Sequence, residues 1–322
     1  MQFPRVPTRR PLASLLTACA VGVALAVTAA GPAQAQGRLP AGGAQVATLG
    51  DSYASGEGAP APGATPWTTN AFGDSGADGC HRSVLSGHAV FGALAVRRNA
   101  GRGAAGYVSA ACSGATTVTL VQGFKGERSQ LAAIGPRTRT VTLSIGGNDV
   151  GFSSVATACN TVATIPGAPS CATALAGSAA ALQALTTAPA GGVTPLEQLY
   201  RAVRAKAPNA RLLVTGYPLL FPTTATASPR CDVIQPAARQ AVNAATLRLN
   251  AAVAAGAQGA GATYVDLVKP FAGHSSCESD PAASWINSIV PQDVVSSLHP
   301  NPTGQRAIAG ALAAADCWRR GR

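Results

Sequence analysis

Short apolar runs alternate with helical patterns along most of this chain. Runs rich in β-branched and other apolar residues predict five strands, at 45–49, 106–110, 140–145, 211–215 and 263–267. Helical patterns fall between and after them, at 88–98, 172–205 with an interruption around 189–195, 235–255 and 302–315. Short apolar strands separated by helices are typical of a parallel sheet covered on both faces, so we predict an α/β fold.

The stretch from Gly56 to Cys80 breaks this alternation. It is rich in Gly, Ala, Pro and Ser and has little periodicity, which predicts a surface excursion. The sequence contains no internal repeat and no sign of a second domain. We therefore expect residues 36–322 to form one catalytic domain, large enough for a full core.

Residues 1–35 have the pattern of an export signal. A basic head is followed by the apolar stretch from Leu12 to Ala30 and by the small-residue sequence Ala33-Gln34-Ala35, which is typical of a cleavage site. The pair Arg9-Arg10 leaves the export route open between the general and twin-arginine pathways. We expect the mature chain to begin near residue 36 and to be secreted.

Charge and composition exclude some classes of function. The whole chain carries a net charge of +11, and residues 1–35 contribute three arginines to it and no acidic residue. The remaining arginines are scattered and do not interleave with aromatic residues, so we expect no nucleic-acid binding. The surplus positive charge favours transient contact with anionic surfaces or substrates.

Seven cysteines follow residue 35, and export favours disulfides over metal ligands for them. The chain has no CxxC pair, and its four histidines lack metal-site spacing. Sequence alone does not fix the pairing; pairing in chain order is the simplest scheme and leaves Cys317 over. In chain order the other six are Cys80, Cys112, Cys159, Cys171, Cys231 and Cys277.

Polar or small residues follow three of the predicted strands directly. Ser52 follows the first strand, Gly114 the second and Asn148 the third. In parallel α/β sheets, ligands bind beyond the carboxyl ends of the strands, so these three positions are expected to meet at one edge. Their neighbours Asp51 and Asp149 are expected to brace local structure by hydrogen bonds.

These positions supply the parts of acyl transfer once His299 is added. The reaction needs a nucleophile, a base that takes its proton and donors for the developing oxyanion. We assign Ser52 as nucleophile and His299, in Leu298-His299-Pro300, as base. The backbone N–H groups of Ser52 and Gly114 and the side-chain amide of Asn148 are the expected oxyanion donors.

Four ordered sequence blocks resemble those of the SGNH (GDSL-type) hydrolases. They contain Ser52 in Gly50-Asp51-Ser52, Gly114 in Cys112-Ser113-Gly114, Asn148 in Gly146-Gly147-Asn148-Asp149, and His299. Gly216-Tyr217-Pro218 and the six spaced cysteines look closest to the secreted bacterial lipases, esterases and phospholipases. The resemblance implies a flavodoxin-like three-layer α/β/α sandwich with a central five-stranded parallel sheet, three disulfides paired in sequence order, and no metal or organic cofactor.

One departure from the family pattern concerns the partner of the histidine. Many members carry an aspartate three residues before it, to orient the imidazole; here that residue is Ser296. The secreted branch uses a backbone carbonyl instead, which implies a Ser52–His299 dyad oriented by the carbonyl of Ser297 or Ser296. Asp293 and Asp266 are the displaced acidic alternatives.

The sequence thus predicts a secreted, monomeric serine ester hydrolase that acts on small-molecule or lipid esters. The apolar bias of the chain and the family branch favour acyl lipids as substrates. Two alternatives stay open, a carbohydrate O-acetyl esterase and a non-catalytic secreted binding protein on the same fold.

Overall fold

The computed structural model describes residues 42–62, 79–98, 106–161, 167, 169–223, 229–289 and 295–320. The expected export signal at 1–35, most of the excursion at 56–80, and Asp293 lie outside these residues. The export signal and the single-domain boundary at residue 36 therefore stay predictions.

The centre of the fold is a parallel sheet of five strands, in the order β2-β1-β3-β4-β5. The strands are β1 (Val46–Gly50), β2 (Tyr107–Ser109), β3 (Thr140–Ser144), β4 (Arg211–Thr215) and β5 (Thr263–Val265). Each lies within two residues of its predicted bounds. This confirms the α/β prediction.

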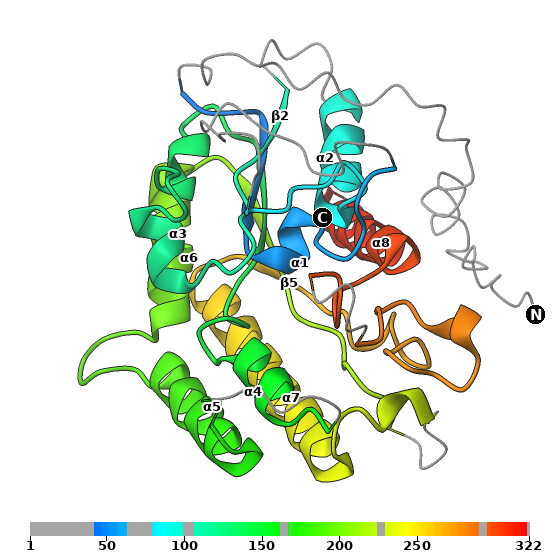
Figure 1. Cartoon of the computed structure of the whole chain (residues 1–322). Coiled ribbons are helices and arrows are strands. Elements are labelled where there is room, and N and C mark those ends of the chain that lie inside the picture. The colour runs from blue at the N-terminus through cyan, green and yellow to red at the C-terminus, as the bar shows by residue number, and fades with distance from the viewer. Residues whose placement is uncertain are drawn as a thin grey trace, which may run out of the picture.

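Helices cover both faces of this sheet (Figure 1). The α-helices of the described residues are α1 (Ser52–Ser55), α2 (Gly87–Arg98), α3 (Thr117–Gln122), α4 (Phe152–Ala158), α5 (Cys171–Thr186), α6 (Pro195–Lys206), α7 (Pro236–Gly259) and α8 (Pro302–Arg320). Helices α2 and α8 pack together on one face, and α6 and α7 pack together on the other. The result is the three-layer α/β/α sandwich that the resemblance implied.

Burial on both faces explains why the central strands are apolar and short. Every residue of β1 and β3 is buried. Two of their hydroxyl groups pair with each other, since Thr48 Oγ1 lies 2.9 Å from Thr142 Oγ1, and the hydroxyl of Tyr107 in β2 donates to Thr48 Oγ1 at 3.0 Å. A buried hydroxyl without a partner would be costly, so these threonines and Tyr107 are matched across the strands.

The structure extends or adds to the predicted helices. Helix α7 continues to Gly259 and α8 to Arg320, beyond the predicted ends at 255 and 315. The short helices α3 and α4 were not predicted. Helix α3 is held by a capping box between Thr116 and Thr119, and α4 starts at Gly151 without a side-chain cap.

Three disulfides pair six cysteines in sequence order, as the resemblance implied: Cys80–Cys112, Cys159–Cys171 and Cys231–Cys277. Cys317 is half-buried and forms no disulfide within the described residues. Among those residues, no helix combines the length and the apolar character needed to cross a membrane.

The strand order places a crevice at one edge of the sheet. After β1 the chain adds β2 on one side, and it then crosses to add β3, β4 and β5 on the other. Loops leaving β1 and β3 therefore diverge to opposite faces, and a crevice opens beyond the carboxyl ends of these two strands. This crevice contains the site described next.

Candidate active site

Ser52 is fixed at the end of β1 by a turn that only glycine fits. Gly50 has φ of +126°, and a Cβ there would lie 2.1 Å from the Ser144 carbonyl oxygen. The side chain of Gln130 holds the same residue twice, accepting from the Gly50 N–H at 2.6 Å and donating to its carbonyl at 2.9 Å. Ser52 then begins helix α1.

Asp51 has the structural role that the sequence suggested. Its carboxylate caps α1 by accepting from the Tyr53 N–H at 3.1 Å, and it also accepts from the Ser144 hydroxyl at 3.0 Å and the Tyr217 hydroxyl at 2.5 Å. Burial raises the pKa of Asp51 to about 7, although these donors oppose the rise. The Tyr217 oxygen in turn accepts from the Gly147 N–H at 2.9 Å, which links the loops after β1 and β3.

The structure brings Ser52 and His299 together across 247 residues of sequence. The Ser52 Oγ lies 2.8 Å from His299 Nε2, and His299 Nδ1 lies 2.9 Å from the Ser297 carbonyl oxygen. A carbonyl can only accept, so the ring proton sits on Nδ1 and Nε2 is left as the acceptor for the serine proton. This is the tautomer that a general base requires.

Of the two carbonyls considered from sequence, that of Ser297 contacts the imidazole. The Ser296 carbonyl instead accepts from the His299 backbone N–H at 3.2 Å and from the Asn287 side-chain amide at 3.1 Å. Ser296 therefore shapes the turn, and Ser297 contacts the ring.

Leu298 connects these residues in a strained backbone conformation. Its φ is +60°, in the left-handed region that a branched side chain rarely occupies. The Leu298 N–H donates to the Asn287 carbonyl at 3.0 Å, and its carbonyl accepts from the Tyr53 hydroxyl at 2.8 Å. Two hydrogen bonds thus hold the turn that presents His299, and strain of this kind is concentrated at functional sites.

Three groups at the crevice have hydrogen-bond donors available. Gly114 has φ of +86°, and Ser52 is the first residue of α1. Within the described ranges the structure records no hydrogen bond from either N–H to another residue. Asn148 uses one amide hydrogen on the Ala115 carbonyl, at 2.9 Å, and keeps its second.

Asp149 braces the loop that contains Asn148. Its carboxylate accepts from the Thr117 N–H and from the Thr117 hydroxyl, the latter at 2.6 Å, at the start of α3. Asp266, one of the two acidic alternatives, is exposed and caps the turn at Val268 and Lys269. No recorded contact joins Asp266 to His299 within the described residues.

Glu57 is the residue that sequence reasoning missed. It is 5% exposed, and its Oε2 lies 3.9 Å from His299 Nε2, while its Oε1 lies 3.0 Å from His81 Nδ1. Burial alone would raise the pKa of Glu57, but the hydrogen bond with His81 and the charge of His299 hold it below its ordinary value. A carboxylate thus faces the same ring nitrogen as Ser52.

The electrostatics around His299 favour a neutral imidazole that is ready to accept a proton. Burial lowers the pKa of His299, while the Glu57 carboxylate and the Ser297 carbonyl partly offset this effect and a charge on His81 adds to it. A base with a pKa below its usual value is unprotonated at neutral pH, and the nearby carboxylate stabilises the cation once it forms.

These groups line a cavity of about 300 Å³. The residues that line it include Ser52, Gly114, Asn148 and His299 and the apolar side chains of Phe152, Ala156, Leu220, Ile289 and Leu298. A cavity lined by both polar and apolar groups suits an acyl ester, whose carbonyl is polar and whose chain is not. No group of three or more His, Cys, Asp or Glu side chains in the described residues is arranged to hold a metal ion.

The chain is similar in sequence to known lipases over most of its length. The model of the GDSL-like Lipase/Acylhydrolase family matches residues 71–307, which include Gly114, Asn148 and His299 and begin after Ser52. The chain is 31% identical over 294 residues to Lipase 1 of Streptomyces coelicolor, covering 91% of this chain and 94% of that protein. It is 32% identical over 258 residues to a lipase of Streptomyces rimosus, covering 80% and 81%.

Two solved structures are similar over nearly their whole length. One is an extracellular lipase from Streptomyces rimosus, with a TM-score of 0.65 and 31% sequence identity. The match covers 99% of that lipase and 84% of this chain. A phospholipase A1 from Streptomyces albidoflavus has a TM-score of 0.64 at 30% identity, with 99% of that chain and 85% of this one covered.

Proposed function

This chain belongs to the GDSL-like Lipase/Acylhydrolase family and is a carboxylic ester hydrolase, and we propose that it cleaves acyl esters through a Ser52–His299 dyad. The observation that carries the proposal is the 2.8 Å contact between Ser52 Oγ and His299 Nε2 beside unused N–H donors. Nucleophile, base and oxyanion donors then line a single cavity.

In the proposed first step, Ser52 Oγ attacks the ester carbonyl carbon while His299 Nε2 takes the hydroxyl proton. The carbonyl π electrons move to oxygen, and the N–H groups of Ser52 and Gly114 with the Asn148 amide stabilise the oxyanion. When the oxyanion collapses, the bond to the alcohol oxygen breaks and His299 returns its proton to that oxygen. An acyl-enzyme remains.

In the second step, His299 removes a proton from water, and the hydroxide oxygen attacks the acyl carbon. When this second oxyanion collapses, the bond between Ser52 Oγ and the acyl carbon breaks, His299 returns the proton to Ser52 Oγ, and the carboxylic acid leaves. The imidazolium formed in both steps is stabilised on two sides, by the Ser297 carbonyl at Nδ1 and by the Glu57 carboxylate, 3.9 Å from Nε2. Glu57 thus supplies negative charge of the kind that the aspartate provides in Ser-His-Asp triads.

The proposed substrates are acyl lipids, because the walls of the cavity beyond the dyad are largely apolar. Lipase and phospholipase relatives agree with a lipid substrate. We also propose that the protein is secreted, as a disulfide-rich chain with an export-type segment at 1–35 and as a relative of an extracellular lipase.

A substrate panel tests this function. Hydrolysis of p-nitrophenyl esters of increasing acyl length is compared with hydrolysis of a phospholipid and of acetylated xylan, for the parent and for Ser52→Ala. We expect turnover of acyl lipids that Ser52→Ala abolishes. A preference for acetylated xylan would favour the carbohydrate esterase alternative, and turnover that survives Ser52→Ala would refute the dyad.

A further inference from the structure

A tight turn at residues 124–127, here called the 124–127 turn, packs behind the loop that contains Gly114. Phe124 and Glu127 pair through two backbone hydrogen bonds of 3.1 and 2.9 Å. Between them Lys125 has φ of +52° and Gly126 has φ of +80°. A two-residue hairpin loop with a type I′ turn requires positive φ at both of these positions. Lysine is an unusual residue at such a φ, which points to a role for its side chain.

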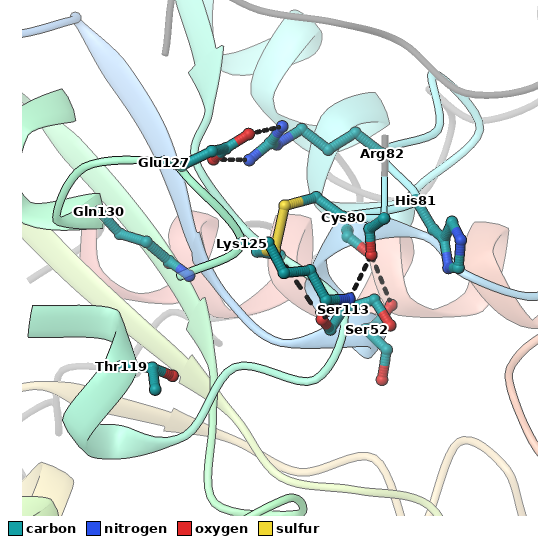
Figure 2. The surroundings of a disulfide bond; sticks show 12 residues. Ser52, Cys80, His81, Arg82, Ser113, Thr119, Lys125, Glu127 and Gln130 are labelled. Atoms are coloured by element: carbon teal, nitrogen blue, oxygen red, sulfur yellow. Dashed lines mark hydrogen bonds and ion pairs between the residues drawn. A yellow bond between two sulfur atoms is a disulfide. The ribbon is translucent and has the colours of Figure 1, made fainter. Parts of the chain in front are cut away.

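The Lys125 ammonium group binds backbone carbonyls of two different segments. It donates to the Ser113 carbonyl oxygen at 2.8 Å and also to the carbonyl oxygen of Gly79. Figure 2 shows the side chain reaching Ser113 beside the disulfide of Cys80. Lys125 therefore joins the two segments that the Cys80–Cys112 disulfide also joins.

The Ser113 carbonyl and the Gly114 N–H belong to the same peptide group. In a trans peptide the C=O and N–H bonds are coplanar and point in opposite directions. A cation that holds the carbonyl on one side therefore turns the N–H to the other side. Gly114 and Ser52 both line the cavity, so the orientation of this N–H bears on the site.

We propose that Lys125 is a positioning residue for the oxyanion hole, acting through the Ser113–Gly114 peptide. It fixes the orientation of the Gly114 N–H, and its charge polarises the peptide so that this N–H becomes a stronger donor. The inference rests on the proposed function, because it concerns an oxyanion that forms only if Ser52 attacks an ester.

Two further contacts hold the turn in place, and a third lies within it. The Phe124 ring packs against Gly114, where an added Cβ would lie 3.3 Å from Phe124 Cε1. Glu127 forms a two-pronged ion pair with the guanidinium of Arg82, which is 1% exposed (Figure 2). Lys125 Nζ lies 5.2 Å from the centre of the Phe124 ring. Lys125 is thus presented by an anchored turn, although it is itself exposed.

A purely structural role for Lys125 would affect folding, substrate binding and turnover together. A role in orienting and polarising an oxyanion donor affects the transition state, in which the negative charge develops. The positioning role therefore predicts a loss of kcat with little change in KM, whereas the structural role predicts changes in both. Only the positioning role predicts that another cation at the same position restores turnover.

The test compares Lys125→Met with Lys206→Met, which removes the same charge from the exposed end of α6. Removal of a whole oxyanion donor lowers kcat by about 100- to 1,000-fold, so weakening one should lower it by roughly 10- to 100-fold. We expect that loss in Lys125→Met on a p-nitrophenyl ester, with KM within about twofold of the parent. Lys206→Met should match the parent, and Lys125→Arg should recover most of kcat.

Lys125→Gly keeps the test valid if the methionine variant fails to fold, because glycine readily adopts the positive φ. We expect the glycine variant to have the same loss of kcat, and added n-butylamine to restore part of it. A kcat within twofold of Lys206→Met in either folded variant would overturn the proposal. Ser52→Ala is assayed alongside: turnover that survives it defeats the proposed function, whereas an inactive Ser52→Ala with unimpaired Lys125 variants defeats only this inference.

Discussion

Replacement of Glu57 by glutamine removes a charge beside the base and keeps the size of the side chain. Glu57 Oε2 lies 3.9 Å from His299 Nε2, and both side chains are largely buried. Coulomb's law gives an attraction of about 4 kcal/mol at this distance for an effective dielectric constant of about 20, and about 1 kcal/mol in water. Because the imidazolium forms during catalysis, Glu57→Gln should lower kcat by between about fivefold and 1,000-fold.

The same substitution should also move the pH profile in a defined direction. Glu57 raises the pKa of His299, in opposition to burial and to a charge on His81, which lower it. Without the carboxylate the pKa of His299 falls, so the neutral base persists to lower pH. The acidic limb of kcat/KM, which reports the free enzyme, should therefore shift to lower pH.

The assay is the pH dependence of kcat and kcat/KM on a p-nitrophenyl ester, with Asp266→Asn as a matched control. Asp266 is an exposed carboxylate that caps a turn, and asparagine can keep that cap. The control should match the parent in both rate and pH profile. If Glu57→Gln left the acidic limb in place or moved it to higher pH, the electrostatic role of Glu57 would be refuted even if activity fell.

Three further substitutions test other parts of the site. Asn148→Ala removes an oxyanion donor and should lower kcat by about 100- to 1,000-fold with little change in KM; a KM effect alone would argue for a binding role. Tyr217→Phe removes a donor from the carboxylate of Asp51. Because burial raises the pKa of Asp51 to about 7, the charged form that needs this donor predominates only above that pH. The free energy of unfolding in urea should fall by about 1–3 kcal/mol, and by more at pH 8 than at pH 5; an equal loss at both would contradict this account. Asp293→Ala should keep hydrolysis within a few-fold of the parent, because a backbone carbonyl already contacts Nδ1 of the catalytic imidazole; a loss of three orders of magnitude in a folded variant would show that an acid is required.

Apolar patterning predicted the sheet because its central strands are buried on both faces. In β1 and β3 every position is covered, so the sequence must be apolar or small throughout, and such runs are visible without any partner. The short helices α3 and α4 were missed because six or seven residues contain too little periodicity. The position of α3 depends on its capping box and on Asp149, which binds α3 from another loop.

The candidate dyad could be proposed from sequence because Ser52 and His299 each lie in a recognisable block. Glu57 and Lys125 could not, for a physical reason. Glu57 lies in a stretch rich in Gly, Ala, Pro and Ser, and only the tertiary fold brings its carboxylate to His299. The ammonium group of Lys125 contacts backbone carbonyls. Every residue has such a carbonyl, so these contacts cannot be recognised from the residue types.

The central claim is that Ser52 is the nucleophile activated by His299, and covalent labelling tests it most directly. The protein is treated with a fluorophosphonate probe at neutral pH, digested and mapped by mass spectrometry, with Ser52→Ala and His299→Ala in parallel. We expect one adduct on Ser52, none in Ser52→Ala, and greatly slowed labelling in His299→Ala. An adduct on another residue, or labelling of Ser52→Ala at the parent rate, would contradict the account.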